Sequence, residues 1–107
     1  MAFDIGAVLR DMASAAGDML AGEGPKVNSC IKAAIEEEKD ALEAIAKARL
    51  DDEIDDADLK SQVTDEKQAL RAALLACEVK GKMAVQKAAN AAIKVFSDAV
   101  KVALKAV

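Results

Sequence analysis

The ionisable side chains most able to bind a cation form one acidic run. Residues 51–58 contain six acids in eight positions. Carboxylate oxygens suit calcium, but the run lacks the turn glycine and the spaced twelfth-position glutamate of an EF-hand loop. The same acids would be stabilised at the start of a following helix, where unpaired N–H groups and the helix dipole attract negative charge. We therefore expect a solvated, helix-capping turn without a metal, and the alternative is a metal-responsive turn.

Groups for catalysis are few in this chain. It contains no histidine, so it lacks the usual base near neutral pH, a Cys–His pair and a Ser–His–Asp arrangement. Neither a GxGxxG motif nor a phosphate-binding loop is present. We predict a non-enzymatic protein that has no catalytic residue and no cofactor.

The two cysteines, Cys30 and Cys77, show no CxxC spacing. A bridge between them is the alternative reading, but facing helices stand about 8 to 10 Å apart, beyond the Cα separation that a disulfide tolerates. We interpret both as small hydrophobic residues of the core. Unpaired cysteines indicate a reducing compartment.

A cytoplasmic location is the resulting expectation. The N-terminal residues MAFDIG lack the basic and apolar regions of a signal peptide. No window approaches the roughly 18 apolar residues of a membrane-spanning helix. Export by a route that uses no cleaved signal stays compatible with the sequence.

An all-α fold follows from the composition and from the spacing of apolar residues. Apolar residues make up 53% of the chain, and Phe3 and Phe96 are its only aromatic residues. The alternation with period two that marks a strand is absent, whereas apolar residues recur at spacings of three and four. At 107 residues the chain is expected to form one domain.

The predicted elements, in chain order, are a helix over residues 3–21, a helix over 26–50, an acidic turn over 51–58 and a long helix over 59–106. Asp4 is a candidate cap of the first helix, and the run Gly-Glu-Gly-Pro that follows it should separate it from the second. The apolar spacing continues through Gly81 without a change of phase, which favours one long helix. Glycine is unfavourable inside a helix, so Gly81 is the position at which this helix could bend or break.

Charged residues inside the apolar stripe suggest how the hairpin is aligned. A turn centred near residue 54 or 55 places Glu38 level with Arg71 and Cys30 nearly level with Cys77. Because an unpaired charge among apolar side chains is unfavourable, we predict that Glu38 and Arg71 form a polar pair that fixes the register.

The second helix is too short to cover all of the long one, and residues 84–107 extend beyond it. The N-terminal helix could pack on this extension, or the extension could pair with a second chain. The apolar arc spans about 220°, more than one short helix covers, and we favour a homodimer. The ridge predicted as the partner or oligomer interface consists of Ile93, Phe96, Val100 and Leu104.

The uneven distribution of charge along the chain suggests a second function, binding to a membrane surface. Residues 36–58 hold eleven acids against three bases, whereas residues 79–107 hold six lysines against Asp98. The lysine edge of the C-terminal helix could bind an anionic membrane surface, although it is narrow and lacks tryptophan. Nucleic acid is not expected as a partner, because arginine and stacking aromatic residues are missing from this edge.

Together these features predict a long antiparallel helical hairpin with a short N-terminal amphipathic helix. The result would be a three- or four-helix bundle that dimerisation could complete. The expected function is a non-enzymatic interaction, assembly or regulatory module that packs helices against a second copy or a helical protein partner. Membrane-surface binding and a metal-responsive turn are the alternatives.

Overall fold

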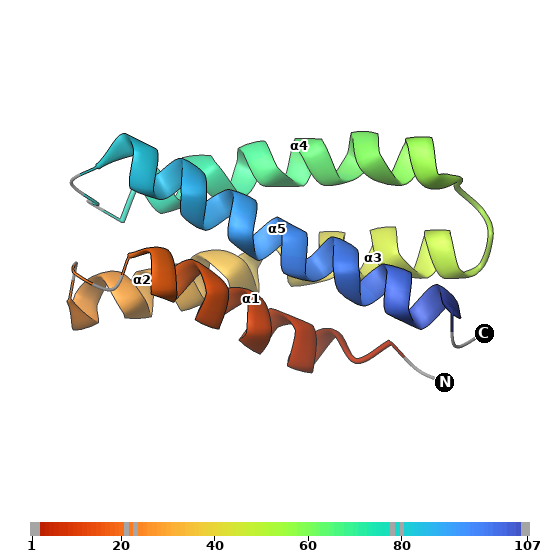
Figure 1. Ribbon diagram of the computed structural model, residues 1–107, viewed down its shortest axis with the longest axis horizontal. Helices are drawn as coiled ribbons and strands as arrows, with labels where there is room; N and C mark the ends of the chain where they lie inside the picture. The colour runs from red at the N-terminus through yellow and green to blue at the C-terminus, as the bar shows by residue number, and fades with distance from the viewer. Residues whose placement is uncertain (1–2, 21, 23, 78, 80, 106–107) are drawn as a thin grey trace.

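The computed structural model describes residues 3–20, 22, 24–77, 79 and 81–105, and these confirm the all-α prediction. Its helices are α1 (Ile5–Met19), α2 (Pro25–Glu37), α3 (Lys39–Leu50), α4 (Asp56–Leu75) and α5 (Lys82–Lys105). Helices α2 and α3 continue in nearly the same direction and turn back into α4, while α5 crosses in front with α1 beside it (Figure 1). The start of α1 and the end of α5 lie near the α3–α4 turn, and the α1–α2 and α4–α5 connections lie at the opposite end (Figure 1).

Local signals in the sequence set the start of α1 and its separation from α2. The Asp4 carboxylate accepts a hydrogen bond from the Ala7 backbone N–H at 3.1 Å, as expected for an N-cap. Gly24 takes a φ of +96°, a conformation that residues with a side chain rarely adopt, and it directly precedes Pro25 at the start of α2.

The acidic turn caps α4, as predicted. Asp55 accepts a hydrogen bond from the Asp58 N–H at 2.8 Å, and the Asp58 carboxylate accepts one from the Asp55 N–H at 3.3 Å. Arg49, at the end of α3, donates from Nε to Asp56 at 2.9 Å and so joins the two helices across the turn. The backbone reverses at Asp52, which has a φ of +61°.

Each of the two predicted hairpin helices is interrupted in the structure. The expected helix over 26–50 is divided at Glu38, whose N–H donates to the carbonyl of Ile35, three residues back instead of four. The expected helix over 59–106 is divided between Leu75 and Lys82, which corrects the prediction of continuity through Gly81. The spacing of apolar residues did not reveal this second interruption. Cys77 and Val79 pack on the core although they lie outside a helix, so the apolar pattern continues where the helix does not.

Helix α5 packs most extensively against α1, within the same chain. Small buried residues on α5, Ala88 and Ala92 among them, allow the two helices to approach closely. At one end the rings of Phe3 and Phe96 meet edge to face, with centroids 6.1 Å apart.

This packing corrects the predicted interface on the C-terminal helix. The ridge proposed for a partner is part of the core: Ile93, Phe96 and Val100 are buried, and Leu104 is partly buried against the same cluster. The expectation that these residues stay uncovered was wrong, because other helices of the same chain cover α5, and α1 does so most extensively. The alternative in which the N-terminal helix packs on the extension describes the structure.

The interpretation of the cysteines as unpaired was also wrong. Cys30 and Cys77 form a disulfide with a Cα–Cα distance of 5.7 Å. The estimate from helix packing failed because Cys77 lies beyond the end of α4, where the chain can approach α2 more closely than a packed helix can. Disulfides persist in oxidising environments, so the argument for a reducing compartment no longer holds.

Removing this bridge should destabilise the protein. The two cysteines are 47 positions apart, and a bridge that closes such a loop typically stabilises the folded state by about 2–4 kcal/mol. We expect the double variant Cys30→Ser/Cys77→Ser to unfold at a lower urea concentration than the wild type, and the wild type in dithiothreitol to behave like the variant. Equal midpoints in all three samples would contradict the prediction.

Candidate functional site

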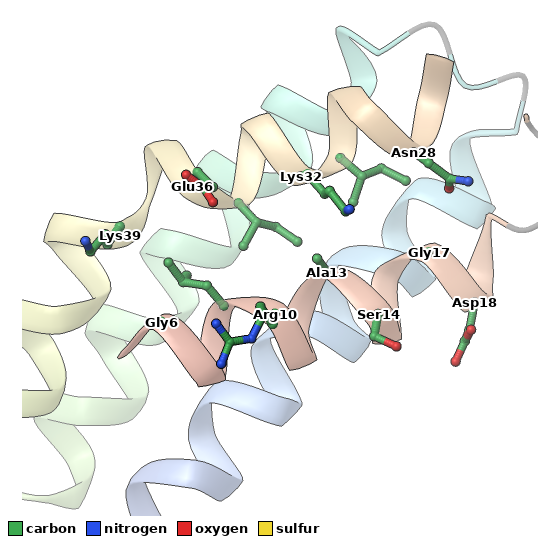
Figure 2. A pocket seen from close by; sticks show the side chains of 13 residues that line it. Gly6, Arg10, Ala13, Ser14, Gly17, Asp18, Asn28, Lys32, Glu36 and Lys39 are labelled. Carbon is green, nitrogen blue, oxygen red and sulfur yellow. The ribbon is translucent and has the colours of Figure 1, made fainter. Parts of the chain in front are cut away.

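An open groove lies between α1 and α2 (Figure 2). It has a volume of about 860 Å³. Its lining residues come from α1, from α2 and from the first residue of α3, and they are Gly6, Leu9, Arg10, Ala13, Ser14, Gly17, Asp18, Asn28, Ile31, Lys32, Ile35, Glu36 and Lys39. We call this surface the α1–α2 groove.

The groove exists because α1 presents small residues toward α2. Its larger apolar residues, such as Met12, are buried in the core, and glycine or alanine occupies positions on the groove side. A Cβ atom added to Gly17 would meet only Asn28 Oδ1, at 3.9 Å, so space remains beside it. The floor consists of Leu9, Ile31 and Ile35, whose side chains are largely buried.

Charged side chains line the edges of the groove. Arg10, Glu36 and Lys39 lie toward one end, and Asp18 lies near Asn28 at the other (Figure 2). The ion pairs that the structure describes join Arg49 to Asp52, Arg49 to Asp56, and Lys94 to Asp98. Within the described residues, therefore, no groove charge is held in an ion pair, and these groups are available to a partner.

A pair of carboxyl groups lies at the α2–α3 junction. Burial is the main reason why the pKa of Glu38 is raised to about 7, followed by a hydrogen bond and charge repulsion with Glu66 on α4, and by repulsion from Glu37. Glu66 Oε2 is buried without a hydrogen-bond partner in the described structure. A proton on Glu38 supplies a donor between the two carboxyl groups, so the neutral form of Glu38 is favoured here.

The predicted pairing of Glu38 with Arg71 does not appear among the ion pairs of the described residues. Glu38 interacts with Glu66 instead, and Arg71 Nε is buried without a partner in this part of the chain. Arg71 is five residues beyond Glu66, which corresponds to about 7 Å along α4. Coupling between Glu38 and Arg71 has no support from a direct contact and stays a prediction.

Sequence reasoning did not find the groove. A usable signal was present, since Gly6, Ala13 and Gly17 recur on the side of α1 that also carries Arg10 and Asp18. The missing information was the position of α2, because a stripe of small residues becomes one wall of a groove only when a second helix forms the other.

The acidic turn and the helices were also compared with what a metal site and a membrane span require. In the described part of the chain, no group of three or more Cys, Asp or Glu side chains is placed to hold a metal ion. Asp55 and Asp58 instead cap α4. None of the described helices is long and apolar enough to cross a membrane.

The Glu38–Glu66 pair predicts a pH-dependent contribution to stability. The pKa of Glu38 is about 7 in the folded state, against an ordinary value of 4.5, so the folded state holds this proton more tightly than the unfolded chain does. The resulting stabilisation of the folded state is complete below about pH 4.5 and is lost as the pH rises through about 7. Glu38→Gln should therefore be more stable than the wild type at pH 8, by on the order of 1 kcal/mol after allowance for partial exposure, and the difference should shrink toward pH 5.

Urea unfolding of wild type and Glu38→Gln at several pH values measures this difference. Glu43→Gln, on an exposed residue of α3, is the control for the loss of a surface carboxylate, and it is measured at the same pH values. A Glu38→Gln effect that is the same at every pH would show that Glu38 does not titrate in this range.

Comparisons with protein-family models, with curated proteins and with solved structures found no match for this chain. A function is therefore inferred from the surfaces of the molecule itself. The α1–α2 groove combines an apolar floor with charges that are unpaired in the described structure.

Proposed function

We propose that this protein is a non-enzymatic helical interaction module, a bundle of helices that binds a further amphipathic helix in the α1–α2 groove. The apolar floor between two helices is the observation that carries this proposal. Amphipathic helices commonly bind by placing their apolar face in such a groove. The helix would come from a protein partner or from a second copy of the chain.

The dimensions of the groove suit a short helix. Gly6 and Asp18, at its two ends on α1, are twelve residues apart, a distance of about 18 Å or just over three helical turns. The groove is partly open to solvent, whereas small-molecule sites usually enclose most of their ligand. An elongated partner with one apolar face fits this shape better than a small molecule does.

The membrane-surface alternative receives less support. It requires apolar side chains exposed beside the lysines of α5, but Ile93, Phe96 and Val100 are buried in the core of the chain. The large hydrophobic residues that α5 does expose are Met83 and Val102, near its opposite ends. Two separated residues do not form the continuous apolar face that lies in a lipid interface.

Filling the groove should abolish helix binding without unfolding the protein. Gly17→Leu places a large side chain in the groove, whereas Gly17→Ala adds a Cβ atom that meets only Asn28 Oδ1 at 3.9 Å. Alanine also favours a helix interior by about 0.5–1 kcal/mol over glycine. We expect Gly17→Ala to be slightly more stable than the wild type and to bind as it does, and Gly17→Leu to fold but not to bind.

Two-dimensional ¹H–¹⁵N NMR titration measures this binding. The probes are synthetic amphipathic helical peptides of about three to four turns, one with an acidic, one with a basic and one with a mixed-charge polar face. Chemical-shift changes concentrated at the groove residues, and lost in Gly17→Leu, are the expected result. Absence of binding by all three peptides, or shifts centred on α4, would contradict the proposed function.

A further inference from the structure

We infer that the α1–α2 groove packs against α1 of a second copy of this chain, antiparallel about a two-fold axis near Ser14. Each α1 would present its small and charged side at this contact, because its large apolar residues are buried in its own chain. This inference rests on the proposed function and names the partner for the same groove. The supporting observation is that the charge pattern of α1 is complementary to the same pattern on an antiparallel α1 of a second copy.

Arg10, Ser14 and Asp18 form a single row along α1. They are spaced by four residues, so they lie on one face of the helix in successive turns. All three are exposed and line the groove. Arg10 and Asp18 stand at equal distances on either side of Ser14, and they carry opposite charges.

A two-fold axis at Ser14 would allow the rows of two chains to form two ion pairs with each other. When two copies of α1 run antiparallel, Arg10 of each copy lies opposite Asp18 of the other, and the two serines meet at the axis. A parallel arrangement in the same register would bring Arg10 against Arg10 and Asp18 against Asp18. The charge pattern therefore selects the antiparallel orientation, in which both copies use the same surface.

The wall formed by α2 is compatible with the same orientation. Glu36 and Lys39, which carry opposite charges, lie toward the Arg10 end of the groove, and Asn28 lies toward the Asp18 end (Figure 2). The incoming Asp18 would enter the end where Arg10 adds a positive charge to the offsetting pair of Glu36 and Lys39, and the incoming Arg10 would enter the end that offers Asp18 and the Asn28 amide oxygen. A uniformly acidic or basic helix would meet repulsion at one of these ends.

Close approach is also possible at the axis. Ala13 and Gly17 stand beside Ser14 on the groove side, and a Cβ atom added to Gly17 would make only an ordinary van der Waals contact, with Asn28 Oδ1 at 3.9 Å. Small residues let two helix backbones approach, which brings the flanking charged side chains within reach of each other. Arg10 can then lay its aliphatic part over the apolar floor while its guanidinium pairs.

Charge reversal tests this arrangement. Arg10→Asp and Asp18→Arg each create two repulsive contacts in a homodimer, because every contact occurs twice about the axis. We expect each variant to dimerise about tenfold more weakly than the wild type, which corresponds to ~1.4 kcal/mol. An equimolar mixture of the two variants should dimerise again. In the mixed dimer the introduced aspartate of one chain faces the introduced arginine of the other, and the native Asp18 of the first chain still faces the native Arg10 of the second.

Sedimentation velocity over a concentration series at low and high salt measures these equilibria. Asp65→Arg is the matched control, since Asp65 is exposed on α4 and does not line the groove, and it should dimerise like the wild type. Circular dichroism of each variant checks that the helices are retained.

The possible outcomes separate this inference from the proposed function. Weakened dimers in both single variants, with recovery in the mixture, support the two-fold arrangement. A wild type that stays monomeric, or a dimer that neither reversal weakens, overturns it. If the wild type is monomeric but amphipathic peptides still bind in the groove, the helix-binding function stands and only the second copy as partner is excluded; if neither occurs, both fail.

Discussion

Helix α5 has apolar side chains over more of its surface than one neighbouring helix can cover, and the other helices are arranged to meet this requirement. Leaving such residues against water is unfavourable in proportion to the exposed apolar area. Helix α1 packs on one side of α5 and α4 packs on the other. For α4 to do so, the chain must turn back between Leu75 and Lys82 instead of continuing as one helix. The interruption is therefore a consequence of burying α5 within one chain, and the Cys30–Cys77 disulfide holds the turn to α2.

The same constraint explains where a binding surface is available. Because α1 directs its large apolar residues into the contact with α5, its opposite side is left with small and charged residues. That side faces α2, and the space between them becomes the α1–α2 groove. The ridge on α5 that was expected to bind a partner is buried within the chain. The surface that remains available lies on α1, the helix that packs most extensively against α5. Self-association through α1 would extend the helix packing already used inside the chain.

Glu38 shows how one charged residue within an apolar stripe is accommodated. The helix is interrupted at this residue, and the side chain meets Glu66 instead of a base. Burial raises the pKa of Glu38 toward neutrality, and the neighbouring Glu66 carboxyl group adds to this effect. The junction of α2 and α3 is thus coupled to pH, and Glu36 and Lys39, which flank it, line the groove.

The sequence by itself determined the all-α class, the caps at Asp4 and at the acidic turn, and the reversal of the chain at that turn. These features depend on spacing and on hydrogen bonds between residues close together in the chain. Tertiary structure decided which helix covers α5, where the long helix is interrupted, whether the cysteines meet and where the groove lies. Each of these outcomes depends on the distance between segments far apart in sequence. Helical periodicity shows that one face of a helix must be buried, but it does not show which other helix of the chain will cover that face.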